Sequence, residues 1–485
     1  MSGCRKLPVP PSTLPLLHSL VATIQNLGRY HDWVVDQFKL FDFAPWTFKV
    51  PGQPPIAMLC SPEAMEEIMV RHFHDFPKGQ FQLDMTEAIF NTSVFGADGK
   101  EWYHQRKIAA KFFTARSLRV MMARSVHKGL EQMQDVLEAD RLAGRPVDLT
   151  KMFGDFTLQT FSELGLGIDL KWIGAATPHP FHRALDEAGV RVAGRFARPM
   201  WLIKLEQWLN VGEEAKLREN VKMIHSWLGS VIQEVLSETN HPEDSEIKSI
   251  IQLFLEQSEK EGDASRLEAK DLVAFIQAFV VAARDTTSHT LAWFFFALSK
   301  HPHIEAKIRE EIAREWPEVA GKPSAYLTME HTKKLMYLEA VIRETLRLYP
   351  AAPSLLREAA CDKVICDDVL IRKGECVCIS LFAMARNPHV WGHDAAEFKP
   401  ERWIDPNTSE LIHVPTAKFS TFSTGPRACL GMSFAMLELR ITVANLLNWY
   451  RFDVDPSNYG AYCHSTVLPM RDPLLASVTL ALRMD

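Results

Sequence analysis

The 485-residue chain carries 54 lysine and arginine residues against 60 aspartate and glutamate residues, a formal net charge of −6. This balance excludes the strongly basic class of nucleic-acid-binding proteins, so we expect no nucleic-acid partner. Hydrophobic residues make up 47% of the chain and charged residues 24%, as in globular proteins with a large core. The eight cysteines lack the spacing of a compact disulfide framework, so we expect them to be reduced and intracellular.

The chain begins with a basic, proline-rich stretch, and no Gly/Ser linker, repeat or low-complexity tract divides the remaining residues. Length alone suggests about three domains. The continuity instead favours a hinge segment over residues 1–30 followed by one domain over residues 31–485. The nearest candidate for a membrane span, Leu14–Ile24, is too short and contains Pro15 and His18. We therefore predict no transmembrane helix in this chain.

Local patterns predict the first elements. Residues 46–60 form two alternating runs around a Pro-Gly pair, which predicts a β-hairpin. Ser61 then has the properties of a helix N-cap, with Pro62 at the first helical position.

Helical patterns dominate from about residue 100 to residue 349, and residues 364–380 alternate like short strands. Residues 466–482 predict another hairpin that turns at residues 471–473. The order of elements is therefore mainly helical with small sheets.

Four cysteines near residue 370 suggest a zinc site as an alternative to strands: Cys361, Cys366, Cys376 and Cys378. Their spacings are poor for a four-cysteine zinc knuckle. The alternation over residues 376–379 favours a strand.

The segment Phe422–Gly431 places Cys429 between two glycines, with Arg427 two residues before it. The apolar periodicity after this segment predicts a helix, whose N-terminal amides would stabilise a thiolate. The glycines permit close approach to a flat group, Arg427 can pair with a carboxylate, and Phe422 can shield the sulfur. The pattern indicates a thiolate that binds a large planar metal cofactor. The alternative is a buried free cysteine in a glycine-rich turn.

This segment resembles the haem-ligand signature of the cytochrome P-450 superfamily, Phe-x-x-Gly-x-Arg-x-Cys-x-Gly, at every fixed position. That superfamily is the established example of thiolate-ligated haem. The resemblance covers the chain from about Leu7 onward. It implies a mainly α fold with small β-sheets, and haem b (iron protoporphyrin IX) between a long central helix and the cysteine loop. Cys429 would be the ligand of the iron.

Glu344 and Arg347 lie three residues apart on a predicted helix, and Arg402 follows in a Pro-Glu-Arg-Trp segment. The two segments resemble the family's Glu-x-x-Arg helix and its Pro-Glu-Arg-Trp loop. This resemblance implies a buried, structural triad that locks the loop leading to Cys429, because buried charges must be paired. The alternative is a surface ion pair, which contributes little.

Trp102 and Arg106 lie one helical turn apart, and Arg357 stands ten residues after Arg347. With Arg427 they match family positions that bind the haem propionates. The arginine fork suits a carboxylate better than a lysine does. Each residue taken singly is typical of a solvated surface.

Asp285 and Thr286 lie midway along a predicted helix of about 30 residues and resemble the family's oxygen-activation motif. The resemblance implies that Thr286 holds an oxygen species by a hydrogen bond while Asp285 relays protons from solvent. The alternative for Thr286 is an ordinary bond to the carbonyl four residues earlier. Ala283 stands where the family often has glycine, so its methyl group would narrow the oxygen groove.

The resemblance implies a monooxygenase that inserts one atom of O2 into a substrate. Its electrons would come from a separate NADPH-dependent cytochrome P-450 reductase, since no G-x-G-x-x-G motif precedes a helix. We expect a monomer on the cytosolic face of the endoplasmic reticulum membrane, by family resemblance. Candidate residues for a basic reductase face, each equally typical of solvated surface, are Lys107, Lys111, Lys418 and Arg440.

The segment Arg284-Asp285-Thr286-Thr287 resembles the corresponding segment of the eukaryotic clan that hydroxylates fatty acids and alkanes. This resemblance implies a hydrophobic substrate such as a fatty acid or related lipid. Two alternatives stay open. One is a P-450-type isomerase or dehydratase acting on a peroxide, against which the Asp285–Thr286 pair argues; the other is a non-catalytic haem sensor or carrier. The candidate pocket residues, nearly all apolar as generic core would also be, are Phe279, Ala282, Ala283, Ala352, Ser354, Leu355 and Val467.

Overall fold

The computed structural model describes residues 5–90, 93–114, 116–175, 177–237, 250–260 and 269–481. Helices account for most of these residues, as expected. The first seven α-helices are α1 (Leu20–Gln25), α2 (Tyr30–Leu40), α3 (Pro62–Glu66), α4 (Gly79–Phe90), α5 (Gly99–Thr114), α6 (Arg116–Ala143) and α7 (Leu149–Phe161). The next six are α8 (Pro180–Arg195), α9 (Met200–Leu209), α10 (Gly212–Ser237), α11 (Ile250–Lys260), α12 (Ala269–Lys300) and α13 (Pro302–Glu315). The last are α14 (Met329–Thr332), α15 (Met336–Leu348), α16 (Leu381–Met384), α17 (Pro388–Trp391) and α18 (Met432–Trp449).

Short 3-10 and π-helical turns join these helices. The two π turns are η2 (Glu67–Arg71) and η3 (Ser162–Leu166). The three 3-10 turns are η1 (Leu27–Arg29), η4 (Pro400–Trp403) and η5 (Gly425–Arg427).

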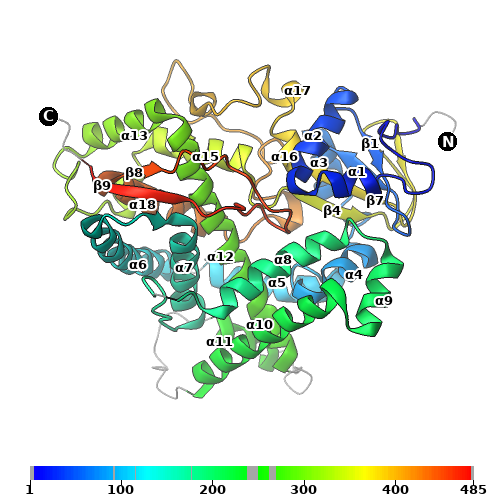
Figure 1. Ribbon diagram of the computed structural model, residues 1–485, viewed down its shortest axis with the longest axis horizontal. Helices are drawn as coiled ribbons and strands as arrows, with labels where there is room; N and C mark the ends of the chain where they lie inside the picture. Colours follow the sequence, from blue (N-terminus) through cyan, green and yellow to red (C-terminus); the bar gives the residue numbers. More distant parts are fainter. Residues whose placement is uncertain are drawn as a thin grey trace.

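The described strands form three small sheets. The four-stranded sheet has the order β1 (Trp46–Phe48), β2 (Ile56–Leu59), β7 (Cys376–Ser380) and β4 (Ser354–Glu358), with β2 and β7 parallel. The three-stranded antiparallel sheet has the order β3 (Val147–Asp148), β9 (Leu475–Leu480) and β8 (Tyr450–Val454). The third is the hairpin of β5 (Lys363–Ile365) and β6 (Val369–Ile371). Figure 1 shows the β8–β9 region and the β1–β7 region at opposite sides of a flattened body, with helices between them.

Local sequence signals placed several elements correctly. The predicted hairpin over residues 46–60 is β1 and β2, paired from Trp46 to Met58. Ser61 caps α3, because its hydroxyl accepts a hydrogen bond from the amide of Ala64 at 3.2 Å. The strands expected over residues 364–380 are also present.

The predicted hairpin over residues 466–482 is wrong. Its second half is β9, which pairs with β8 and β3. Before the turn, Met470 forms only an isolated bridge with Tyr462. The buried residues of β9, Ala476 and Val478, face the core, and alternation shows which face is buried without showing which strand lies beside it.

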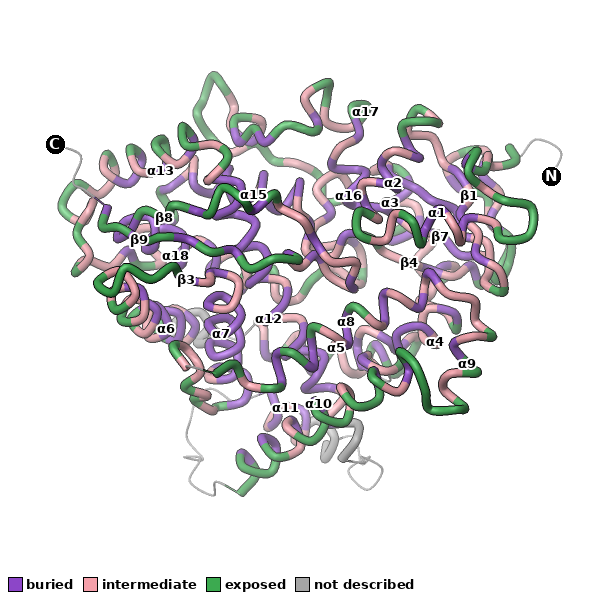
Figure 2. Tube along the Cα trace, in the orientation of Figure 1, coloured by how far each residue is buried: buried purple, intermediate pink, exposed green. Residues whose placement is uncertain are grey.

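The long helix α12 links two hydrophobic clusters of the core. Its residues 272–281 belong to one cluster and residues 291–298 to the other. The polar stretch 284–290 between them is also mostly buried. Burial concentrates in α7, α12, α15 and α18 (Figure 2). The fold therefore holds polar side chains in its interior, midway along α12.

Among the described residues, no helix combines the length and apolar composition that a membrane crossing needs. The cysteines expected on a strand are there, since Cys376 and Cys378 lie on β7. Within the ranges that the structure describes, no group of three or more His, Cys, Asp or Glu side chains is placed to hold a metal ion.

Candidate active site

The loop before α18 presents Cys429 at the start of that helix. Its amide donates to the carbonyl of Phe422 at 2.8 Å, which closes the loop over η5. Gly425 has a φ of +67° there, and a Cβ on it would lie 2.2 Å from the carbonyl oxygen of Met69 in η2. A Cβ on Gly431 would have Phe113 as its nearest described neighbour, at 3.8 Å. The positive φ and the contact with the backbone of η2 therefore account for a glycine at position 425.

Cys429 is a free and exposed thiol beside the amides of the first turn of α18. The surrounding protein raises the pKa of Cys429, while backbone hydrogen bonds from Gly431 and Met432 and the charge of Arg106 act to lower it. Arg106 also donates to the carbonyl of Ala428 at 2.6 Å. The expected helix terminus is confirmed, and it offsets desolvation of the thiol only in part.

A cluster of buried cations lies beside this loop. Arg427 donates to Asp98 at 2.5 Å, and its guanidinium lies 4.5 Å from the ring centre of Trp102. Arg357 on β4 is buried, and burial together with the charge of Arg427 lowers its pKa to about 9. Burial likewise lowers the pKa of Arg427 to about 10 and that of Lys78 far below its usual range. Solvated surface is thus excluded for Arg357 and Trp102.

This cationic cluster has more donors than acceptors. Within the part of the chain that the structure describes, the Nε atoms of Arg357 and Arg427 are buried without a hydrogen-bond partner. Asp98 is the acid that acts on Arg357 and Arg427. Buried donors of this kind are expensive to leave unpaired. The cluster therefore fits the carboxylates of a haem, and Lys78 joins it without any signal in the sequence.

The Glu344 network is closed. Glu344 Oε2 accepts from Arg347 Nε at 2.8 Å, and Glu344 Oε1 accepts from Arg402 Nε at 2.9 Å. Glu344 also accepts from the indole of Trp403 at 2.9 Å and from the amide of Lys399 at 2.8 Å. Its side chain is 0% exposed. The surface-pair alternative is therefore excluded, and the sequence missed two of the four partners of Glu344, the indole of Trp403 and the amide of Lys399.

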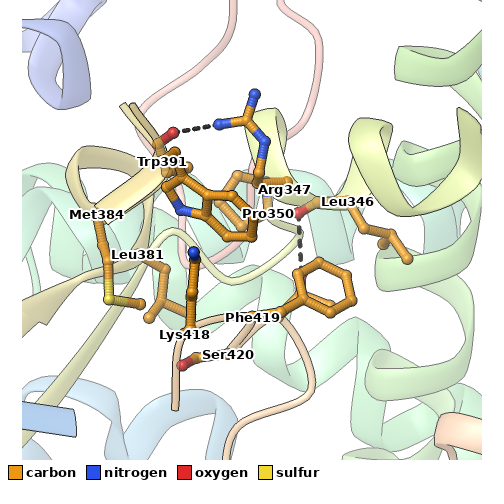
Figure 3. A pocket seen from close by; sticks show the side chains of 11 residues that line it. Leu346, Arg347, Pro350, Leu381, Met384, Trp391, Lys418, Phe419 and Ser420 are labelled. Atoms are coloured by element: carbon orange, nitrogen blue, oxygen red, sulfur yellow. Dashed lines mark hydrogen bonds between the residues drawn. The ribbon is translucent and has the colours of Figure 1, made fainter. Parts of the chain in front are cut away.

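A narrow crevice borders this network (Figure 3). In it, the ring of Trp391 lies between Arg347, at 5.1 Å, and the ammonium group of Lys418, at 4.7 Å. Arg347 donates to the carbonyl of Ala385, and the carbonyl of Leu346 accepts from Thr421 at 3.0 Å. The crevice has a volume of about 10 Å³, room for one water molecule. It is no substrate site.

On α12, Thr286 donates to the carbonyl of Ala282 at 2.7 Å, the bond that the ordinary helical alternative predicts. Asp285 is buried and accepts from Arg284 at 2.7 Å. Burial raises its pKa to about 6, although the charge of Arg284 acts against this shift. α12 runs unbroken past Ala283. The pair is therefore a half-buried hydroxyl beside a buried acid that can take up protons.

The candidate pocket residues divide into two groups. Phe279 is buried and packs on Phe275 and Phe113 with ring centres 4.9 and 6.1 Å away, so it is core. The others are half-buried or exposed, on α12, on β4 and on two loops. Those loops are joined because the amide of Leu468 donates to the carbonyl of Ala351 at 3.1 Å. The accessible candidates are Ala282, Ala283, Ala352, Ser354, Leu355 and Val467.

The four expected members of a basic docking face differ. Lys107 and Lys111 are exposed on α5. Lys418 lies over Trp391, and Arg440 donates to the carbonyl of Met436 at 3.0 Å. Lys107 and Lys111 are thus the more exposed members of this set.

Comparison with known proteins covers most of the chain. The family model described as Cytochrome P-450 matches residues 8–467. The chain is 30% identical to cytochrome P-450 704C1 of Pinus taeda, over 97% of the chain and 93% of that protein. It is also 30% identical to cytochrome P-450 86B1 of Arabidopsis thaliana, over 92% of the chain and 81% of that protein. Cytochrome P-450 94B1 of the same plant is 29% identical, over 93% and 86%.

Proposed function

Because the chain belongs to the cytochrome P-450 family of haem-iron monooxygenases, we propose that Cys429 would supply the thiolate ligand of its haem iron, with the haem in the haem b form. The observation that supports this most is the accessible thiol at the start of α18, next to the guanidinium groups of Arg357 and Arg427, whose buried Nε atoms have no partner among the described residues. When bound, the haem supplies the activation of O2 for insertion into a C–H bond.

The chain's own side chains would hold the haem at its edge and at the sulfur. We assign Arg357 and Arg427, with Arg106 and Trp102 beside them, to the propionates, because their unpaired donors need acceptors. Phe422 would shelter the sulfur. Glu344, Arg347 and Arg402 would fix the loop that carries Cys429, a structural role.

Midway along α12, Asp285 and Thr286 would deliver protons to oxygen. Asp285 would take a proton from solvent and pass it on, and Thr286 would orient the acceptor. For this the Thr286 hydroxyl, which donates to the carbonyl of Ala282, would turn from that carbonyl toward the oxygen.

We propose a fatty acid or related lipid as the hydrophobic substrate. The apolar, partly accessible candidates Ala282, Ala352, Leu355 and Val467 support this, together with the clan resemblance around Asp285. Electrons would come from an NADPH-dependent reductase that docks on the α5 side. The protein would be a monomer, with a single domain over residues 31–485.

We further propose attachment to the cytosolic face of the endoplasmic reticulum membrane. One face of α9 supports this, because Trp201, Leu205, Trp208 and Leu209 follow helical spacing and are all exposed. An exposed apolar helix face of this kind suits a membrane interface.

The test of the central assignment is the spectrum of the reduced carbon monoxide complex. We expect the red-shifted Soret band of a thiolate haem in the wild type and its loss in Cys429→Ser. The matched control is Cys361→Ser, which changes another exposed free cysteine. A retained band in Cys429→Ser would overturn the ligand assignment. Spin-state shifts with medium- and long-chain fatty acids, against sterols, test the substrate class separately.

A further inference from the structure

Arg284 bridges two carboxylates on different helices. Its Nη1 atom lies 2.6 Å from Oδ1 of Asp186 on α8 and 2.7 Å from Oδ1 of Asp285 on α12. A second contact joins Nη2 of Arg284 to Oδ2 of Asp186 at 3.3 Å. One guanidinium group is thus shared between two acids.

The two acids differ in their access to solvent. The Asp285 side chain is 10% exposed and the Asp186 side chain is 55% exposed. Burial raises the pKa of Asp285, whereas the charge of Arg284 keeps the pKa of Asp186 below its usual value despite desolvation. Asp186 is therefore a stable anion at the solvent end of the bridge, and Asp285 is the acid that can change its protonation.

The other charged groups around the bridge are largely balanced among themselves. On α7, Lys151 pairs with Asp155 at 2.9 Å. Burial lowers the pKa of His182 on α8 to about 3 and that of His289 on α12 to about 4, so both are neutral at pH 7. The thiol of Cys463 faces Asp186 from the loop before β9, and burial raises its pKa.

Arg284 itself is held in place from α7. The hydroxyl of Thr157 donates to the carbonyl of Arg284 at 3.1 Å, and Gly154 lies beside the guanidinium group, whose Nη2 atom is 3.7 Å from where a Cβ on Gly154 would stand. The bond from Thr157 therefore anchors the backbone of Arg284. Its guanidinium group, at the end of the side chain, is the part that contacts both carboxylates.

We propose that Asp186 is a positioning residue for the proton carried by Asp285, acting by sharing the guanidinium group of Arg284 between the two carboxylates. The inference rests on the proposed role of Asp285 in proton delivery. Without the charge of Asp186, Asp285 is the single carboxylate in contact with Arg284 among the described residues. The loss of Asp186 also removes a negative charge near Asp285. Both changes stabilise ionised Asp285, which then gives up its proton at lower pH.

The test compares three substitutions on α8 in the haem-loaded protein. Asp186→Asn removes the shared charge, Asp186→Glu restores a carboxylate, and Glu187→Gln is the matched control. Glu187 lies next in sequence but pairs with Arg183 and Arg191 at 2.7 and 3.0 Å instead of Arg284.

Two readouts are needed. The first is the pH midpoint of the Asp285 carboxyl carbon by NMR of aspartate-labelled protein, with the signal identified by its loss in Asp285→Asn. The second is the pH dependence of product formed per reductant consumed. We expect Asp186→Asn to lower both midpoints by about one pH unit, which cuts the protonated fraction about tenfold above them. Asp186→Glu should restore most of the shift, and Glu187→Gln should leave both midpoints in place.

The results separate the two proposals. If Asp285→Asn turns over normally, the proton role of Asp285 falls and the inference falls with it. If Asp285→Asn is impaired but Asp186→Asn moves neither midpoint, only the inference about Asp186 is overturned. An equal shift in Glu187→Gln would also overturn it, because general charge loss on α8 would then explain the effect.

Discussion

Arg347 and Arg284 are both buried arginines on core helices, yet their partners differ in number and in exposure. Arg347 faces one carboxylate, that of Glu344, through two bonds of 2.8 and 2.9 Å, and donates to three backbone carbonyls besides. Arg284 faces two carboxylates, and its Nε atom is buried without a partner among the described residues.

The difference separates a structural network from one that can change its charge. Around Glu344 every oxygen is bonded, so protonation of Glu344 would break several contacts at once. Around Arg284 two acids share one cation. Burial raises the pKa of Asp285 to about 6, the charge of Arg284 opposes this shift, and the charge of Asp186 adds to it. The Glu344 network is therefore closed and structural, whereas at Arg284 two carboxylates share a single cation.

The largest expected effect is on the closed network. Glu344→Ala would strand Arg347 as a buried charge without a carboxylate, at a cost of about 3–5 kcal/mol, whereas Arg402 would keep Asp394. Since domains are stable by about 5–15 kcal/mol, we expect little folded haem protein. Haem content and the denaturation midpoint measure this. Glu330→Ala is the control, because Glu330 pairs with Lys333 at the same spacing, 2.7 Å apart, but is exposed; normal haem content in Glu344→Ala would contradict the prediction.

The next effect concerns Asp285 and the pH dependence of stability. Burial raises its pKa from 3.8 to about 6. Between these pH values the folded protein binds more protons than the unfolded chain. The contribution of Asp285 to the free energy of unfolding therefore falls as the pH rises through this window. The loss is complete above about pH 6 and on the order of 3 kcal/mol. Asp285→Asn should therefore flatten the decline in urea midpoints measured across this range.

Asp394 in the closed network gives the opposite sign as a control. A hydrogen bond from Lys399 and the charge of Arg402 lower its pKa from 3.8 to about 2. The stabilising contribution of Asp394 to the free energy of unfolding is present above pH 3.8 and is lost as the pH falls toward 2. Asp394→Asn should leave the decline above pH 4 intact. If both variants changed the same window, the contrast between the two networks would be lost.

The smallest change in structure is expected from Thr286→Ala, and its effect should be on coupling. Loss of the hydroxyl removes one bond to Ala282 and leaves haem binding intact, but oxygen is less well held and more of it should leave as peroxide. Reductant consumed, peroxide released and product formed are the quantities to compare. The control is Thr290→Ala, which loses an identical 2.7 Å bond to the carbonyl of Thr286. Wild-type coupling in Thr286→Ala would exclude the oxygen-orienting role.

Local signals in the sequence were reliable where one segment contains all the relevant atoms. The cap of α3 by Ser61 needs only the four residues 61–64, and the β1–β2 hairpin lies within residues 46–59. The cysteine at a helix start follows in the same way from the segment Phe422–Gly431. In each case chain connectivity brings the interacting groups together, so the pattern and the contact coincide.

Contacts between distant segments were not accessible in this way. Lys78 and Asp98 join the cationic cluster beside Arg357, and Asp186 meets Arg284 from a position 98 residues away. A lone lysine or aspartate carries no sign of its distant partner. The prediction of the final hairpin was wrong for the same reason, because β9 pairs with the distant strand β8 and not with the residues just before it.

The sequence by itself determined the family, the cysteine at the start of α18 and the Glu344–Arg347 spacing, because each is written in consecutive or helically spaced residues. The tertiary structure decided which charges are closed and which are shared. Burial and distance, not residue type, set that outcome: Glu344 is enclosed by donors, whereas Asp285 must compete with the solvent-facing Asp186 for one arginine. Electrostatic energy depends on separation in space and on desolvation, and neither can be read from order along the chain.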